Sequence, residues 1–86
     1  MYDGPEQTVT LKCENELMKS IVDRFGEDVE TEALSDEHFC ARVRVSASPT
    51  FLGWVFGFGG RMDIIAPQDI ADEYIMLARF VADKAR

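Results

Sequence analysis

The 86-residue chain has few residues of the kinds that bind metals or phosphates. It holds two cysteines, Cys13 and Cys40, and a single histidine, His38. Because a structural zinc site takes about four such ligands at close spacing, we expect no metal site. Nine basic residues are outnumbered by sixteen acidic ones, and the net charge is -7. That balance argues against a surface that holds nucleic acid through its phosphates.

Long apolar runs are missing as well. No segment approaches the ~20 apolar residues of a membrane-spanning helix. The N-terminus, where Asp3 and Glu6 occur among polar residues, lacks the apolar centre of a signal peptide. Hydrophobic residues still make up 47% of the chain, which suffices for one core and argues against global disorder. The composition therefore predicts one soluble, cytoplasmic domain with no membrane contact.

Alternating apolar and polar residues, which are typical of half-buried strands, occur in four segments. They are residues 8–13, 28–34, 39–46 and 61–66. Cys13 falls on the apolar side of the first strand and Cys40 on the polar side of the third. The two thiols are therefore expected to leave opposite faces of the sheet and to form no disulfide.

The second and third strands are predicted to form a hairpin around a polar turn at residues 35–38. Its expected register places Glu30 opposite Arg44 and Glu32 opposite Arg42, because opposite charges that face each other across a strand pair favour such a pairing. Together with a lysine of the first strand, these residues make up the expected open-sheet surface: Lys12, Glu30, Glu32, Arg42 and Arg44.

Three segments are predicted to be helices, namely residues 15–25, 49–58 and 67–83. The central helix has Ser48 as its cap and Pro49 at its first helical position. It is expected to end where Gly59 and Gly60 can adopt the left-handed conformation. Trp54 lies in the middle of this uncharged segment and is expected to be largely buried.

The order strand, helix, strand, strand, helix, strand, helix indicates an α+β fold. Two split βαβ units form a four-stranded antiparallel sheet with two helices on one face, the ferredoxin-like arrangement. The usual strand order places the first and third strands in the centre, and the last helix is an addition. Residues 1–7 are interpreted as a tail or linker stub, and residues 8–86 as the domain.

The apolar surface of the two later helices exceeds what one sheet can cover. The central helix is apolar nearly all round, and the last helix carries one stripe at Ile70, Tyr74, Leu77 and Val81 and a second stripe beside it. If the last helix leaves the central one uncovered, a two-fold dimer would bury the excess. The residues expected on this interaction surface are Phe51, Phe58, Ile75, Met76 and Phe80.

No group of residues indicates catalysis. His38 lies in an acidic turn with no nucleophile near it in sequence. The glycines at 57–60 follow a helix, whereas a phosphate cradle has amides that open one. The outward positions of the central strands carry no aromatic residue on which RNA bases could stack. We therefore expect no catalytic residue, no cofactor and no direct binding of nucleic acid.

The central stretch resembles the C-terminal extension of WYL-domain transcriptional regulators. The specific part is Phe51-Leu52-Gly53-Trp54-Val55-Phe56-Gly57-Phe58-Gly59, followed by Ile64-Ile65-Ala66-Pro67 and a closing helix. The similarity begins with Val9-Thr10-Leu11-Lys12, continues with Arg24-Phe25-Gly26, and spans roughly residues 8–81.

The resemblance implies a role in bacterial transcription regulation. Proteins of that family carry an N-terminal winged-helix DNA-binding domain, a central ligand-sensing WYL domain and this ferredoxin-like extension, which contributes to dimer contacts and regulation. The sequence contains neither the winged helix nor a Trp-Tyr-Leu motif. We interpret the chain as an excised C-terminal domain that begins at an introduced Met1. Its implied partners are a second copy and the WYL domain of the full-length protein.

Two other functions remain alternatives at this stage. One is a free-standing small-molecule sensor of the ferredoxin-like type. The other is a small enzyme on this scaffold, such as an acylphosphatase. That chemistry uses an anion cradle and an arginine between the first strand and the first helix, where this chain has Cys13-Glu14-Asn15-Glu16. The two carboxylates there would repel a phosphate.

Overall fold

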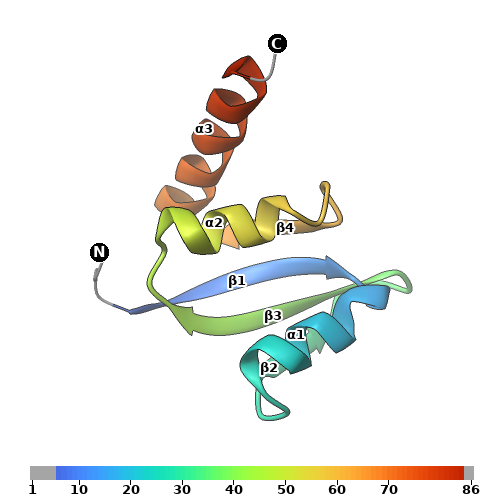
Figure 1. Cartoon of the computed structure of the whole chain (residues 1–86). Coiled ribbons are helices and arrows are strands. Elements are labelled where there is room, and N and C mark those ends of the chain that lie inside the picture. Colours follow the sequence, from blue (N-terminus) through green and yellow to red (C-terminus); the bar gives the residue numbers. More distant parts are fainter. Residues whose placement is uncertain (1–5, 85–86) are drawn as a thin grey trace.

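The computed structural model describes residues 6–84, and its centre is a four-stranded antiparallel sheet (Figure 1). The strands are β1 (Gln7–Glu14), β2 (Glu30–Ala33), β3 (His38–Val45) and β4 (Met62–Ala66), in the order β2-β3-β1-β4. The first and third strands are thus central, as predicted, and the fold is ferredoxin-like. Residues 1–5 of the predicted tail lie outside the described residues.

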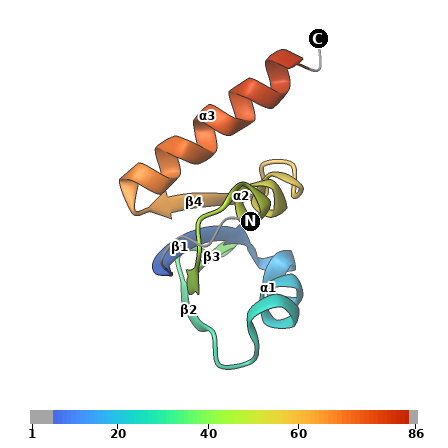
Figure 2. The same cartoon turned by 60° about the vertical axis from the view of Figure 1, so that its left-hand side comes forward.

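The three predicted helices are present, and they alternate with the strands in the predicted order. A 3-10 turn, η1 (Asn15–Leu17), leads into α1 (Met18–Phe25), and the other helices are α2 (Pro49–Phe56) and α3 (Gln68–Lys84). Helices α1 and α2 cover the same face of the sheet, because Ile21 of α1 and Val55 of α2 both belong to the buried core, together with Leu17 of η1. The opposite face carries no helix over the two central strands (Figures 1 and 2).

Local signals explain where α2 begins and ends. The side chain of Ser48 accepts a hydrogen bond from the amide of Phe51 at 3.3 Å, and Pro49 occupies the first helical position. The helix ends at Phe56, earlier than the predicted residue 58. Gly59 and Gly60 do adopt positive φ angles of 66° and 90°, but they shape the turn after the helix rather than its last residue.

The core lies between the sheet and the two helices. Its sheet side consists of the inward residues of β1, β3 and β4, namely Val9, Leu11, Cys13, Phe39, Ala41, Val43, Met62 and Ile64. Helix α2 contributes Phe51, Leu52 and Val55. No buried polar or charged residue occurs in the described part of the chain, so apolar burial is the main force that holds the layers together.

The predicted hairpin register is wrong by two residues. Glu30 pairs with Arg42, Thr31 with Ala41, and Glu32 with Cys40. The hydroxyl of Ser35 accepts a hydrogen bond from the backbone amide of His38 at 3.2 Å, and this bond tightens the turn. As a result, His38 is the first residue of β3 and not part of the turn. A shift of two positions leaves every side chain on its own face, so apolar alternation could not distinguish the two registers.

Both cysteines are free, as the strand phases predict. Cys13 is fully buried in the core. Cys40 lies on the other face, opposite Lys12 of β1 and Glu32 of β2, yet it is also buried. The small thiol lies in the middle of the sheet among long charged side chains, and their aliphatic stems exclude water from it.

Candidate interaction surface

Helix α3 is attached to the body by its N-terminal half. Ile70 and Ala71 are buried, and Tyr74 and Leu77 are half-buried and pack on the core. Burial, assisted by the negative charge of Asp63 on β4, raises the pKa of the Tyr74 hydroxyl. Contacts with β4 and α2 therefore hold the first three turns of α3, as far as Leu77, against the edge of the domain.

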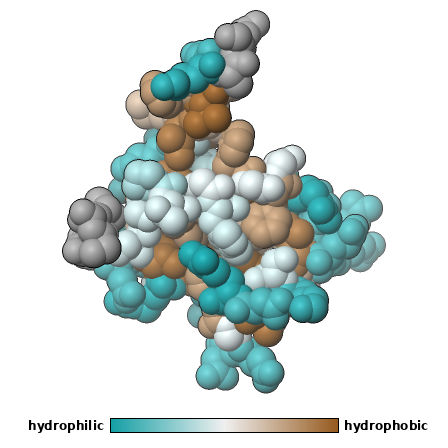
Figure 3. All heavy atoms as spheres, in the orientation of Figure 1, coloured by the Kyte–Doolittle hydropathy of each residue, from teal (hydrophilic) through white to brown (hydrophobic). Residues whose placement is uncertain are grey.

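The C-terminal part of α3, which we call the α3 arm (residues 75–84), packs on the body through Leu77 at its start and then extends away from it (Figures 1 and 2). Four large apolar side chains on this arm are 41–69% exposed: Ile75, Met76, Phe80 and Val81. Figure 3 shows hydrophobic residues along the lower part of α3, between its hydrophilic tip and the body. Soluble monomers seldom expose a continuous apolar patch of several hundred Å², so the arm is the strongest candidate for a protein contact.

The structure separates the five residues expected on the interaction surface. Ile75, Met76 and Phe80 are exposed on the α3 arm. Phe58 is half-buried against Trp54, at a ring-centroid distance of 5.1 Å. The expectation for Phe51 is wrong, because Phe51 is buried in the core. Its place one turn before Val55 puts both side chains on the face of α2 that meets the sheet.

Sequence reasoning did not single out Phe56, which is 43% exposed at the end of α2. Because α2 is apolar nearly all round, no pattern in the sequence distinguishes its covered side from its open side. Spacing relative to Phe51 and Val55, once these are known to be buried, places Phe56 off the core face.

Trp54 is only partly buried and lies where α1 meets α2. Its ring packs edge-on against Phe25 at 5.7 Å and stacks on Phe51 at 6.2 Å. The guanidinium of Arg24 lies over the same ring at 5.2 Å. Trp54 is therefore not one of the fully buried core residues: it packs against the core and closes the boundary between the two helices.

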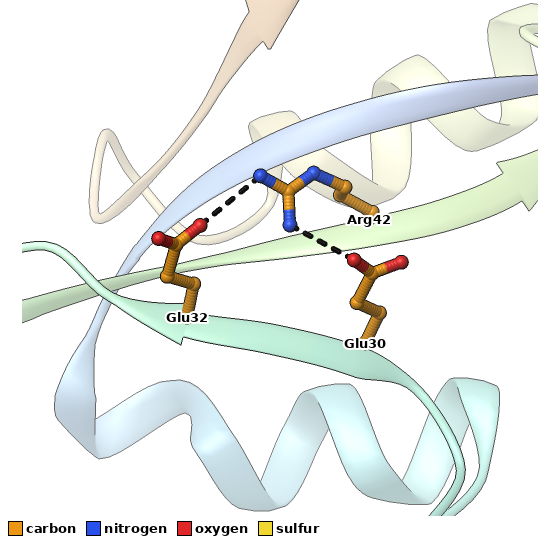
Figure 4. Close-up of polar contacts among 3 residues, drawn as sticks. All are labelled: Glu30, Glu32 and Arg42. Carbon is orange, nitrogen blue, oxygen red and sulfur yellow. Dashed lines mark hydrogen bonds and ion pairs between the residues drawn. The ribbon is translucent and has the colours of Figure 1, made fainter.

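On the open-sheet surface, the charges are largely paired. The guanidinium of Arg42 lies between Glu30 at 3.2 Å and Glu32 at 3.1 Å (Figure 4). The hydrogen bond to Glu32 and the charge of Glu30 raise the pKa of Arg42. Arg44 lies 3.8 Å from Glu6, and Lys12 is exposed between the neighbouring strands. Paired, water-facing charges of this kind explain register and solubility without a ligand.

The surface of the domain also has two shallow hollows. One, of about 310 Å³, is lined by Glu14, Asn15, Glu16, Glu37 and His38. Arg61 binds two of its carboxylates, at 3.2 Å from both Glu14 and Glu16. The other, of about 360 Å³, is lined by Phe25, Asp28, Val29, Glu30, Arg42, Val43 and Arg44. Within residues 6–84, no group of three or more histidine, cysteine or carboxylate side chains could hold a metal ion.

Comparison with known protein families places the chain in one of them. The family model of the WCX domain matches residues 5–82. The WCX domain is the C-terminal domain found in WYL-containing regulators. No curated protein and no solved structure matches the chain. Among the described residues, no helix has both the length and the apolar character needed to cross a membrane.

Proposed function

Because the chain belongs to the WCX domain family, we propose that it is the C-terminal regulatory domain of a bacterial WYL-type transcriptional regulator that acts in the cytoplasm. The observation that carries this proposal is the family match over residues 5–82. In this role the domain is not an enzyme. DNA reading and effector sensing belong to other domains of the full-length protein.

The charge of the domain supports a role away from DNA. Its net charge is -7, and a surface that neutralises phosphates needs a cluster of free cations. Arg42 and Arg61 each lie between two glutamates instead. The domain therefore acts through contacts with proteins, namely a second copy and the WYL domain of its own chain.

Self-association is the contact that the fold supports best. Met76 and Phe80 are 69% and 60% exposed on a helix that extends beyond the body. The second apolar stripe of α3 is thus left uncovered by the fold of its own chain, which supports a dimer. Removing these side chains from water in a two-fold contact would stabilise a dimer by the hydrophobic effect.

Sedimentation velocity over a concentration series tests this role. We expect the sedimentation coefficient to rise with concentration from the monomer value to that of a dimer, because a single small patch gives a weak association. A pure monomer at the highest soluble concentration would contradict dimerisation. The family assignment would stand, and the WYL domain would remain as the partner of this surface.

A further inference from the structure

Four residues of α3 form one row along its exposed side. Asp72, Met76, Phe80 and Lys84 are spaced four apart, so they follow one of the ridges by which helices pack into each other's grooves. All four are exposed. Asp72 and Met76 lie on the side of α3 away from the buried Ile70, and the row turns gradually round the helix toward Lys84. The ridge therefore has two large apolar residues in its middle, an acid at one end and a base at the other.

The side chains of the ridge are positioned by their neighbours. The amide of Gln68 donates a hydrogen bond to Asp72 at 2.9 Å, which holds the carboxylate in place at the start of the helix. The ammonium group of Lys84 lies over the Phe80 ring at 5.5 Å. Charge and apolar surface thus occur side by side at both ends of the ridge.

Charge along the whole helix is divided in the same way. The N-terminal half carries three carboxylates, Asp69, Asp72 and Glu73. The C-terminal half within the described residues carries Arg79, Asp83 and Lys84, a sum of +1. Two such helices side by side in parallel would place three carboxylates against three carboxylates. An antiparallel pair places each acidic half against the basic half of its partner.

We propose that the α3 ridge binds the α3 ridge of a second copy in antiparallel orientation, with Met76 of each chain against Phe80 of the other and Asp72 against Lys84. The numbers of these opposed residues have the same sum, so the arrangement repeats by a two-fold axis and closes as a dimer. The inference rests on the dimerisation part of the proposed function and specifies its surface, orientation and register.

Apolar substitutions on the ridge test the surface. Met76→Glu or Phe80→Glu is expected to weaken the dissociation constant of the dimer by at least about 100-fold, because each places two carboxylates per dimer in the apolar centre of the contact. The matched control is Leu34→Glu, since Leu34 is 48% exposed in the β2–β3 turn, far from α3 in the fold. This variant is expected to associate like the unmodified chain, and circular dichroism checks that every variant is folded.

Charge reversals test the orientation. Asp72→Lys and Lys84→Asp are each expected to weaken the dimer about tenfold, because each replaces two attractive pairs by two repulsive ones. The chain with both reversals is expected to regain the original dissociation constant. If only net charge mattered, Asp72→Lys would strengthen the dimer, since this change lowers the excess negative charge that keeps two copies apart.

Each outcome decides one point. If the unmodified chain is a monomer, the dimer and its α3 register both fail. If it is a dimer that Met76→Glu and Phe80→Glu leave unchanged, dimerisation stands and another surface carries it, so the ridge is not the contact. If these variants dissociate the dimer but the double reversal does not restore the effect of Asp72→Lys, the antiparallel register is wrong.

Discussion

At the scale of single residues, Trp54 joins the two helices that cover the sheet. It contacts Phe25 of α1 as well as Phe51 and Phe58, and Arg24 lies over its ring. We expect Trp54→Ala to lower the free energy of unfolding by about 2–3 kcal/mol, below the ~3–5 kcal/mol of a fully buried tryptophan, because Trp54 is only partly buried. Urea denaturation followed by circular dichroism measures the change, since the variant has no tryptophan fluorescence.

Phe56→Ala is the matched control for this change. Phe56 lies in the same helix and is 43% exposed, so its truncation is expected to cost less than about 1 kcal/mol at concentrations where the chain is monomeric. Equal losses for the two variants would show that the aromatic cluster around Trp54 adds no stability beyond the burial of one ring.

The buried thiol of Cys13 is expected to make the domain less stable at alkaline pH. Burial, followed by the charges of Cys40 and Asp63, raises the pKa of its thiol from 9.0 to about 12. Above pH 9 the unfolded thiol loses its proton while the folded one keeps it, so the unfolded state binds fewer protons and stability falls as pH rises. The stabilisation is complete below pH 9 and is lost progressively between pH 9 and 12.

Urea titrations at about pH 8 and pH 10 measure this slope, whose limit is ~1.4 kcal/mol per pH unit for one proton. Cys13→Ala is expected to show a smaller loss between the two values than the unmodified chain. Val9→Ala, a truncation on the same buried face of β1, creates a comparable cavity and is expected to keep the original slope. Identical slopes in all three chains would disprove the role of the thiol.

At the scale of elements, β2 is the least constrained strand of the sheet. It has four residues, all of them exposed, and it pairs only with β3. Its position depends on the turn at Ser35 and on the two ion pairs of Arg42, since little apolar surface fixes it. An edge strand of this kind can slip by two residues without moving a side chain to the other face.

The register of β2 can be tested with the native thiol of Cys40. Glu32 is the direct cross-strand partner of Cys40, so Glu32→Cys is expected to form a disulfide with it under mild oxidation. Leu34→Cys, two residues further along the chain and just after the end of β2, is expected to leave both thiols free. Intact mass after thiol alkylation separates these outcomes. A disulfide in the Leu34→Cys chain alone would restore the register that the sequence predicts.

At the scale of the whole molecule, acidity and the protruding helix α3 suit a domain that binds proteins. With a net charge of -7, the domain repels the DNA backbone at long range. We expect no change in the fluorescence anisotropy of a labelled DNA duplex on addition of the chain, even at low salt where electrostatic binding is strongest. Binding that weakens as salt is added would contradict the assignment of DNA contact to other domains.

The sequence by itself determined the elements, their order and the face to which most residues turn. Alternation placed Val9, Leu11 and Cys13 on one side of β1, and the pair Ser48-Pro49 marked the first residue of α2. These signals are local: a strand's period and a helix cap depend on neighbours within a few residues. The family resemblance likewise followed from residues close together in the chain.

Only the tertiary structure decided what depends on contacts between distant segments. The chain pattern could not tell that Phe51 is buried while Phe56 is exposed, because both lie on a helix that is apolar nearly all round. It could not fix which glutamate faces Arg42, because both registers keep the same faces. Nor could it show how far α3 extends past the body. Burial is set by which surfaces meet in space. Met76 and Phe80 remain in water because the contact of α3 with β4 and α2 ends before it covers them.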